Sequence, residues 1–217
     1  MNARIRVSLA TASVAALALA GCTSNSRGGA PEESTAPSAS ASQNSALADK
    51  LPAKIRSAGT IVIGTDASYA PNEFLADDGK TVQGMDVDLF NAVAAKFGVR
   101  TAWQPADFPL IITGVQGKKY DIGISSFTVD DERKKQATMV SYFSAGTQWA
   151  TAKGNPKNVD IDEACGKNIA VQTGTAQETG DLPIRQQECE EGNKINILSY
   201  KGQDQATAAV LSGKADA

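Results

Sequence analysis

From about residue 60 onward, short β-branched runs alternate with stretches whose apolar residues recur at helical spacing. Residues 60–65, Thr-Ile-Val-Ile-Gly-Thr, are such a run and predict a buried strand. Residues 86–97 carry apolar side chains at helical spacing, begin with two acids and are followed by Gly98, which predicts a helix. By the same criteria, strands are predicted at 99–103, 120–124, 168–171 and 195–198, and helices at 107–116, from about 176, and at 203–211.

The order of these elements predicts an α/β fold in two lobes. Turn residues at 77–80 place a hairpin after the first strand. The strand–helix–strand connections that follow imply mostly parallel sheets with helices on their faces. Residues 139–153 are extended and lack a helical period, and beyond them the alternation starts again. We therefore expect one lobe at 51–147 and a second, joined to it by an extended crossover, at 148–217.

The first residues have the pattern of a secretory signal peptide. Arg4 and Arg6 precede an apolar run at 7–20 that is too short to span a bilayer. The run ends in Leu-Ala-Gly-Cys22, which resembles the bacterial lipobox, where cleavage leaves the cysteine at the new N-terminus for lipid attachment. An ordinary signal peptide with an incidental cysteine is the alternative. Residues 1–21 are thus predicted to be a lipoprotein signal, and Cys22 the lipidation site.

Residues 22–50 are predicted to be the lipidated cysteine and a disordered tether. Ser, Ala, Gly, Pro and Thr dominate the segment after Cys22, and they offer almost nothing to bury. A lipid followed by a flexible stalk places a folded module at the outer face of the cell membrane.

The amino-acid composition excludes several classes of function. The chain has 217 residues, 24 acids, 21 bases, no histidine and three cysteines. Without histidine there is no histidine base and no histidine-ligated metal, and three cysteines cannot form a four-thiolate zinc site. The net charge of −3 gives no general attraction to nucleic acid or to an anionic membrane. We therefore expect no catalytic residues, no metal, no cofactor and no nucleic-acid partner.

Four stretches carry a specific resemblance through their order and spacing. They are Gly64-Thr-Asp-Ala-Ser-Tyr-Ala-Pro71, Gly84-Met-Asp-Val-Asp-Leu-Phe90, Asp121-Ile-Gly-Ile-Ser-Ser-Phe-Thr128 with Arg133, and Val171-Gln-Thr-Gly-Thr-Ala-Gln177. From Ile55 to the C-terminus the chain resembles the family 3 extracellular solute-binding proteins, the amino-acid receptors of ABC importers. The resemblance implies the periplasmic binding protein type 2 fold, in which two α/β lobes close on a ligand. It also implies an amino acid ligand, the transmembrane subunits of an ABC permease as partner, and a monomer.

The resemblance places the ligand carboxylate in the first lobe. A carboxylate is best held by a planar fork of donors together with backbone N–H groups. Ser125, Ser126 and Thr128 follow a predicted strand end, where α/β ligand sites lie. By resemblance, Arg133 pairs with the carboxylate, and Thr128 and the backbone of Ser126 assist it; Ser125 belongs to the same candidate set. The alternative is that Arg133 belongs to a solvated charged run at 130–135.

A second candidate segment precedes the predicted helix that starts near residue 176. Free N–H groups at the start of a helix attract an anion. By resemblance, Thr175, Ala176 and Gln177 close on the ligand carboxylate from the second lobe. An ordinary helix cap accounts for the same residues.

Three further residues are candidates for the ligand side chain. By resemblance, Tyr69 and Phe108 match aromatic positions that sandwich the side chain in relatives, with core packing as the alternative. Asp66 stands at a strand end, where its carboxylate can bind a cationic side chain of the ligand. The alternative is that Asp66 only forms a turn. If Asp66 faces the pocket, a basic or otherwise polar amino acid is favoured. Trp103 and Trp149 are interpreted as packing residues.

Cys165 and Cys189 are predicted to form a structural disulfide. An extracytoplasmic compartment permits one, neither cysteine belongs to a Cys-x-x-Cys pair, and no histidine is present to assist a reactive thiol. Two free thiols are the alternative.

The predicted function is that of a substrate-binding lipoprotein of an ABC importer. A dehydratase-like periplasmic enzyme on the same scaffold, with Asp66 or Glu73 as acid and base, is one alternative. A lipoprotein that senses the ligand is another. Residues 214–217 look like the start of a strand of the second lobe, and relatives continue beyond it with an acidic residue for the ligand ammonium group. We therefore expect the second lobe to be incomplete and amino-acid binding by this chain to be weak or absent.

Overall fold

The first helix that the structure describes lies within the segment predicted to be a tether. The computed structural model describes residues 44–217, so the predicted signal peptide and Cys22 lie outside the described residues. Helix α1 (Ser45–Ala48) is capped by Asn44, whose backbone N–H also donates to the Lys96 carbonyl at 2.9 Å. These bonds tie residues 44–48 to the first lobe. The prediction of disorder up to residue 50 is therefore wrong at its C-terminal end.

The first lobe is built on a parallel sheet with the strand order β5-β1-β6. Its strands are β1 (Thr60–Thr65), β5 (Arg100–Pro105) and β6 (Ile122–Gly123). Ile63 on the central strand is completely buried and lies in register with Trp103 on one side and Ile122 on the other. A central parallel strand is covered on both faces, which explains its continuous apolar run.

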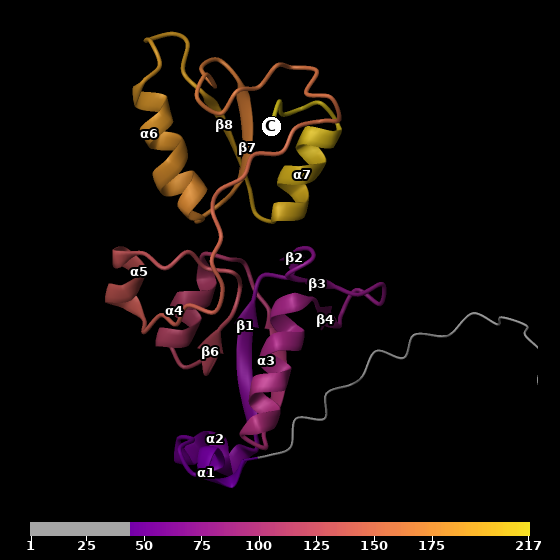
Figure 1. The fold of residues 1–217 in the computed structure, drawn as a ribbon, viewed down its shortest axis with the longest axis vertical. Coiled ribbons are helices and arrows are strands. Elements are labelled where there is room, and N and C mark those ends of the chain that lie inside the picture. The colour runs from indigo at the N-terminus through magenta and orange to yellow at the C-terminus, as the bar shows by residue number, and fades with distance from the viewer. Residues whose placement is uncertain (1–43) are drawn as a thin grey trace, which may run out of the picture. The chain divides into compact units, whose positions relative to one another are not determined.

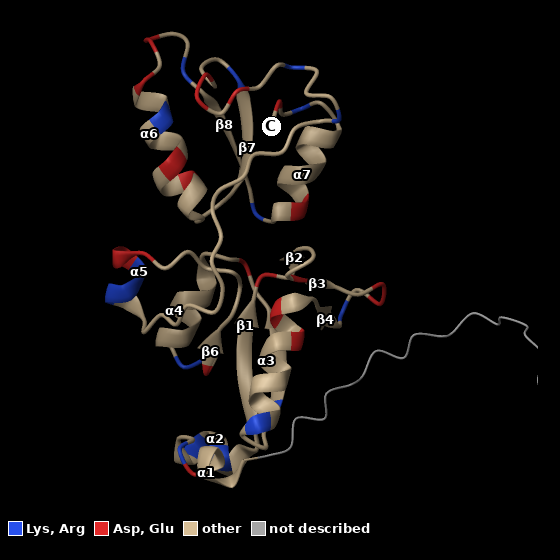
Figure 2. Cartoon of the chain, in the orientation of Figure 1, with Lys and Arg blue, Asp and Glu red and all other residues tan. Residues whose placement is uncertain are grey.

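Helices cover this sheet. Helix α2 (Ala53–Ala58) precedes β1, α3 (Met85–Lys96) packs beside β5, and α4 (Leu110–Gln116) packs against β1 and β6 (Figure 1). Acidic residues occupy the first turn of α3 and a lysine its last turn (Figure 2), the arrangement that the helix dipole favours. Trp103 packs edge-on against Phe90 of α3, with ring centroids 6.4 Å apart, as expected for a packing residue.

The predicted hairpin is a small antiparallel sheet of three short strands. Its strands are β2 (Ser68–Tyr69), β3 (Glu73–Leu75) and β4 (Val82–Gln83). Asp78 closes the turn between β3 and β4 by accepting from the backbone N–H groups of Lys80 and Thr81, each at 2.8 Å. This small sheet places β3 beside the start of α3.

The second lobe repeats the strand–helix alternation. Strands β7 (Asn168–Gln172) and β8 (Asn196–Tyr200) pair in parallel, and α7 (Gln203–Leu211) packs against both. A π-helical turn, η1 (Gln177–Asp181), continues into α6 (Leu182–Gln187). No helix or strand is assigned between residues 137 and 167, which include the predicted extended stretch.

The last residues of the chain lie against β7. The Asp216 N–H donates to the Asn168 carbonyl at 2.7 Å, and the Ala170 N–H donates to the Ala217 carbonyl at 2.8 Å. These bonds hold the last two residues beside β7, but no strand is assigned at 214–217, so the predicted strand start stays a prediction. Together, the two sheets and their helices confirm the α/β, two-lobed fold class; the proposed boundaries at 51, 147 and 148 stay predictions.

Two local features differ from the predictions. Helix α4 begins at Leu110 with Pro109 as its N-cap, because Asp107 lies outside the helix and pairs with Lys201 at 3.7 Å. Helix α5 (Asp131–Gln136) was not predicted, because its residues are all charged or polar and have no apolar period; only Arg133 among them was assigned a role, by resemblance. Within residues 44–217, no helix is both long enough and apolar enough to cross a membrane.

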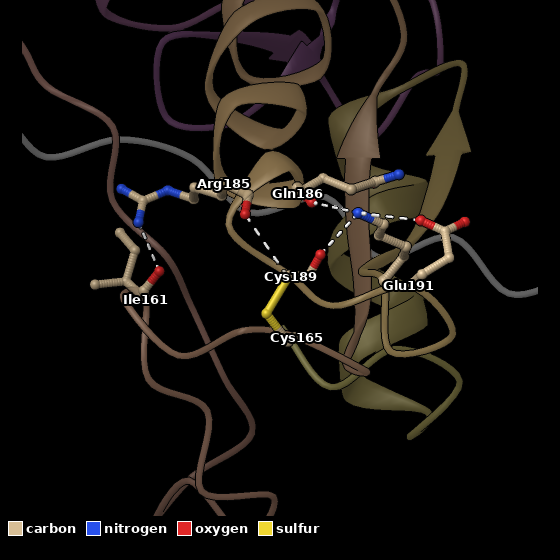
Figure 3. Close-up of a disulfide and its surroundings, with 7 residues drawn as sticks. Ile161, Cys165, Arg185, Gln186, Cys189 and Glu191 are labelled. Carbon is tan, nitrogen blue, oxygen red and sulfur yellow. Dashed lines mark hydrogen bonds and ion pairs between the residues drawn. A yellow bond between two sulfur atoms is a disulfide. The ribbon is translucent and has the colours of Figure 1, made fainter.

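The predicted disulfide is present. Cys165 and Cys189 are bonded, with Cα atoms 5.5 Å apart, and Cys189 belongs to the buried core of the second lobe. Around the bond, Arg185 Nη1 donates to the Ile161 carbonyl at 2.6 Å, and Lys194 Nζ donates to the Cys189 carbonyl at 2.7 Å (Figure 3). The disulfide and these bonds fasten the loops around α6 to one another.

Replacing both cysteines by serine is expected to lower the free energy of unfolding by about 3 kcal/mol, because the bond closes a loop across a separation of 24 residues. Denaturant unfolding followed by circular dichroism measures this change. A reducing agent should destabilise the unaltered protein to a similar extent and leave the double variant unchanged. A loss below about 1 kcal/mol in the double variant would contradict the prediction.

Candidate functional site

A cavity of about 910 Å³ is lined by residues of both lobes. All the residues predicted to contact the ligand line it: Asp66, Tyr69, Phe108, Ser125, Ser126, Thr128, Arg133, Thr175, Ala176 and Gln177. Its size is that of a small-molecule site. The structure thus brings the predicted set together around one space, while the contact of each residue with a ligand stays a prediction.

The first-lobe side of the cavity lies at the carboxyl ends of two neighbouring parallel strands. Asp66 directly follows β1, and Ser125 comes two residues after β6. The Asp66 N–H donates to Ser125 Oγ at 3.0 Å, which ties the two strand ends together. Ligands of open α/β sheets bind at this position.

Asp66 is 6% exposed and is held by four donors. One carboxylate oxygen accepts from the backbone N–H and the hydroxyl of Ser68. The other accepts from the Phe108 N–H at 3.0 Å and from Gln172 Nε2 at 3.1 Å. Burial raises the pKa of Asp66 in spite of these bonds. Asp66 is therefore a turn-forming aspartate that also faces the cavity, and its oxygens are already occupied.

Arg133 is 8% exposed, so it is not a solvated member of the charged run. Its Nη1 donates to the Thr128 carbonyl at 2.8 Å and its Nη2 to the Gly174 carbonyl of the second lobe at 3.0 Å. The guanidinium lies 5.6 Å and 5.3 Å from the rings of Phe108 and Phe127. Burial lowers its pKa, although Asp130 opposes the shift. With two of five N–H groups on carbonyls, the fork keeps donors for a carboxylate.

The neighbours of Arg133 behave differently. Lys134 and Lys135 are exposed and pair with Asp131 and Glu132 on the same helix, at 3.1 Å and 2.6 Å. Figure 2 shows these acidic and basic positions together on α5. The helix therefore presents its charged residues to solvent and turns only Arg133 inward.

Ser126 adopts a left-handed backbone conformation, with φ of 48°, which is uncommon for a residue with a side chain. Its backbone N–H donates to the Tyr142 hydroxyl oxygen at 3.1 Å. Its own hydroxyl accepts from Asn72 Nδ2 at 2.8 Å and donates to Asp86 at 3.1 Å. Strained residues of this kind cluster at functional sites. Tyr142 was not among the predicted site residues, and no sequence pattern points to it.

Two acids beside Ser125 and Ser126 were not in the predicted ligand-binding set. Glu73 and Asp86 are each 1% exposed. Burial first, then a hydrogen bond with Asp86 and its charge, raise the pKa of Glu73 from 4.5 to about 9. Glu73 was considered only as an acid in the enzyme alternative, and Asp86 only as an acid at the start of a helix. Their pairing could not be predicted from the sequence, because only the packing of the hairpin against α3 brings the two carboxyl groups together.

The second-lobe side of the cavity is a tight turn followed by η1. Thr175 Oγ1 donates to the Gln172 carbonyl at 2.7 Å and accepts from the Glu178 N–H at 3.3 Å. Gly174 has φ of 77°, and a Cβ there would lie 2.8 Å from Pro109 Cγ, so only glycine fits. Thr175 thus caps the turn, as the alternative interpretation requires, while its position on the cavity keeps it in the candidate set.

The aromatic candidates differ in exposure. Phe108 is buried and stacks on Phe127, with ring centroids 4.4 Å apart. Tyr69 is 41% exposed. Trp149 packs against the core of the second lobe, as predicted, and also lines the cavity. Phe108 therefore packs at the wall of the cavity. Of the two aromatic candidates, Tyr69 is the more exposed and the more accessible to a ligand.

Comparison with known proteins gives matches over most of the folded part. Residues 61–216 match the family described as bacterial extracellular solute-binding proteins, family 3. Among curated proteins, the chain is 37% identical over 169 residues to the arginine-binding protein ArgT of Corynebacterium glutamicum, covering 77% of this chain and 55% of that protein. It is 31% identical over 160 residues to the lysine/arginine/ornithine-binding periplasmic protein of Escherichia coli, covering 73% and 59%. The chain thus spans less than two thirds of the length of these relatives.

Solved structures show the same likeness. An ancestral amino acid-binding protein, AncCDT-1, described as a precursor of cyclohexadienyl dehydratase, has a TM-score of 0.67 and 30% identity, with 75% of this chain and 70% of that chain covered. An ancestral arginine-binding protein bound to arginine has a TM-score of 0.61 and 28% identity, with 73% and 68% covered.

Proposed function

Because the chain belongs to the bacterial extracellular solute-binding proteins of family 3, we propose that it is the receptor of an ABC importer that captures a polar amino acid, preferentially a basic one. The observation that carries this proposal is the set of predicted ligand contacts gathered around one cavity with the buried fork of Arg133 among them. The bound amino acid would then be delivered to the transmembrane subunits of a permease.

The polarity of the cavity supports a ligand with a carboxylate at one end and a positive charge at the other. Among the residues that line it, Arg133 is the one cation, whereas Asp66 and Glu73 are buried acids. A carboxylate at Arg133 leaves the ligand side chain to the acidic end. The names of the relatives include arginine, lysine and ornithine, which are amino acids of this charge pattern.

We propose an extracytoplasmic location for the folded part, with the lipid on Cys22 as anchor to the outer face of the membrane and a monomeric receptor. The disulfide between Cys165 and Cys189 supports an oxidising compartment. The relatives described as periplasmic or extracellular support the same side of the membrane. Labelling with a radioactive fatty acid, lost in Cys22→Ala, tests the anchor.

Titration calorimetry with a panel of arginine, lysine, glutamine and leucine tests the ligand class. We expect weak but saturable binding of arginine and lysine, at least tenfold weaker binding of glutamine, and no detectable binding of leucine, since only a cationic side chain balances the negative charge at the acidic end of the cavity. Tightest binding of leucine would contradict the proposed preference. Absence of binding to any amino acid, both by this chain and by one extended to the length of its relatives, would contradict the proposed receptor function.

A dehydratase-like enzyme is the second candidate, and the buried Glu73 on the cavity wall favours it, since a carboxyl group with a pKa of about 9 is a proton donor at neutral pH. The two functions differ in what happens to the ligand. A receptor returns each bound molecule unchanged after long incubation, whereas an enzyme releases a product that mass spectrometry detects.

A further inference from the structure

Glu73 on β3 and Asp86 in the first turn of α3 form a buried pair whose hydrogen bonding is incomplete. Ser125 Oγ donates to Glu73 Oε1 at 2.9 Å. Asp86 Oδ2 accepts from the Tyr142 hydroxyl at 2.6 Å and from the Ser126 hydroxyl at 3.1 Å. The remaining oxygens, Glu73 Oε2 and Asp86 Oδ1, are buried and receive no donor from other side chains or the backbone. An ionised oxygen in that position is costly, so packing alone does not explain the pair.

The groups that face the pair supply no positive charge. The charges of Asp86 and Asp66 both act on Glu73 as like charges. Burial raises the pKa of Tyr142, so that it is a neutral donor. In the part of the chain that the structure describes, no lysine or arginine forms an ion pair with Asp66, Glu73 or Asp86. The cavity's own cation, Arg133, is held by the carbonyls of Thr128 and Gly174.

We propose that Glu73 and Asp86 share one proton in the ligand-free protein, and that the cationic side chain of a bound amino acid replaces this proton. A proton on Glu73 Oε2 lets it donate to Asp86 Oδ1, which satisfies both oxygens at once. The pair then carries one negative charge. When the cation binds, the proton leaves to solvent, both carboxyls ionise, and the positive charge of the ligand returns the group to a net charge of minus one.

Two observations place the exchange at Glu73. Glu73 is among the residues that line the cavity and Asp86 is not, and the buried Glu73 Oε2 has no donor from the protein. Asp66 also lines the cavity, but its carboxylate already has four donors. A cationic side chain that displaces the proton therefore gains an oxygen without a protein donor at Glu73, whereas both oxygens of Asp66 are occupied. The raised pKa of Glu73 agrees with a proton held there at neutral pH.

The proposed replacement of the proton by a ligand cation rests on the proposed receptor function. Calorimetry tests them separately, because it measures both ligand binding and proton release. Arginine is titrated at pH 7 into the protein in phosphate and in Tris, whose ionisation enthalpies differ, so the difference in heat counts the protons released. We expect close to one proton per arginine and none per glutamine. Glu73→Gln is expected to abolish the release and to weaken arginine binding about tenfold or more. The exposed acid Glu132 on α5 provides the matched control, and Glu132→Gln should release the same proton as the unaltered protein.

Each of the other possible results contradicts a specific part of the proposal. Arginine binding without proton release overturns the replacement and leaves the receptor function standing. Equal release with glutamine assigns the replacement to the α-ammonium group and overturns the role of the side chain. If no amino acid binds, the receptor function and the replacement both fail. The shared proton is tested without ligand by carbon-13 nuclear magnetic resonance of the Glu73 carboxyl, assigned by its loss in Glu73→Gln. A carboxyl that is ionised at pH 7 overturns the shared proton.

Discussion

Replacing Arg133 by alanine is expected to weaken amino-acid binding by about 30-fold or more. The guanidinium is buried, and removing one partner of a buried, charged hydrogen-bonded pair costs about 2–5 kcal/mol. The loss arises because a ligand carboxylate would enter a desolvated site with no cation to meet it. Arg133→Lys keeps the charge but lacks the planar fork, so intermediate binding is expected.

The test needs a control for folding as well as for charge. Arg133 also donates to the carbonyls of Thr128 and Gly174, so its removal disturbs the structure around the cavity. Near-ultraviolet circular dichroism and thermal unfolding report on that disturbance, while calorimetry reports on binding. Lys134→Ala removes a positive charge one residue away from an exposed position and should bind as tightly as the unaltered protein. Arginine binding by Arg133→Ala within threefold of that control would refute the assigned role.

The elements that were predicted correctly are those that local pattern determines. Strand β1 and helix α7 have the bounds that were expected, 60–65 and 203–211. In β1, a continuous β-branched run fits a strand that is covered on both faces. The Cys165–Cys189 bond was likewise predicted from compartment and count. Such features depend on neighbours in sequence or on the identity of single residues.

The features that were missed depend on contacts between distant segments. The run at 130–135 reads as solvated, and only the packing of α5 beside Phe108 and Phe127 shows that Arg133 is buried. The order of residues 44–50 depends on a bond from Asn44 to Lys96. No local pattern contains these contacts, because each is made by residues far apart in the chain.

The candidate site shows the same division. Resemblance to the family gathered ten candidate contacts, and all of them line one cavity. The resemblance did not assign Glu73, Asp86 or Tyr142, whose significance lies in their mutual hydrogen bonds and burial. A carboxyl group that holds a proton is invisible in a sequence, because its pKa is set by what surrounds it.

The free energy of unfolding is expected to fall as pH rises from about 4.5 to about 9, and Glu73 is expected to cause most of the fall. The ordinary pKa of this carboxyl is 4.5, and burial and Asp86 raise it to about 9 in the folded protein. Between these values the folded state holds a proton that the unfolded state has lost. Unfolding therefore releases a proton, and each such proton lowers the stability by about 1.4 kcal/mol per pH unit.

The stabilising contribution of protonated Glu73 is thus fully present below pH 4.5 and is lost as pH rises through 9. Glu73→Gln keeps the shape and a hydrogen-bond donor but cannot ionise, so its stability should depend much less on pH across this window. Asp66, whose pKa burial also raises, acts in the same direction and remains in the variant. Denaturant unfolding at pH 5, 6, 7 and 8 measures both slopes, and Glu132→Gln should follow the unaltered protein because Glu132 is exposed. Parallel slopes for the unaltered protein and Glu73→Gln would show that Glu73 ionises normally, since only a proton kept in the folded state makes the two curves diverge as pH rises.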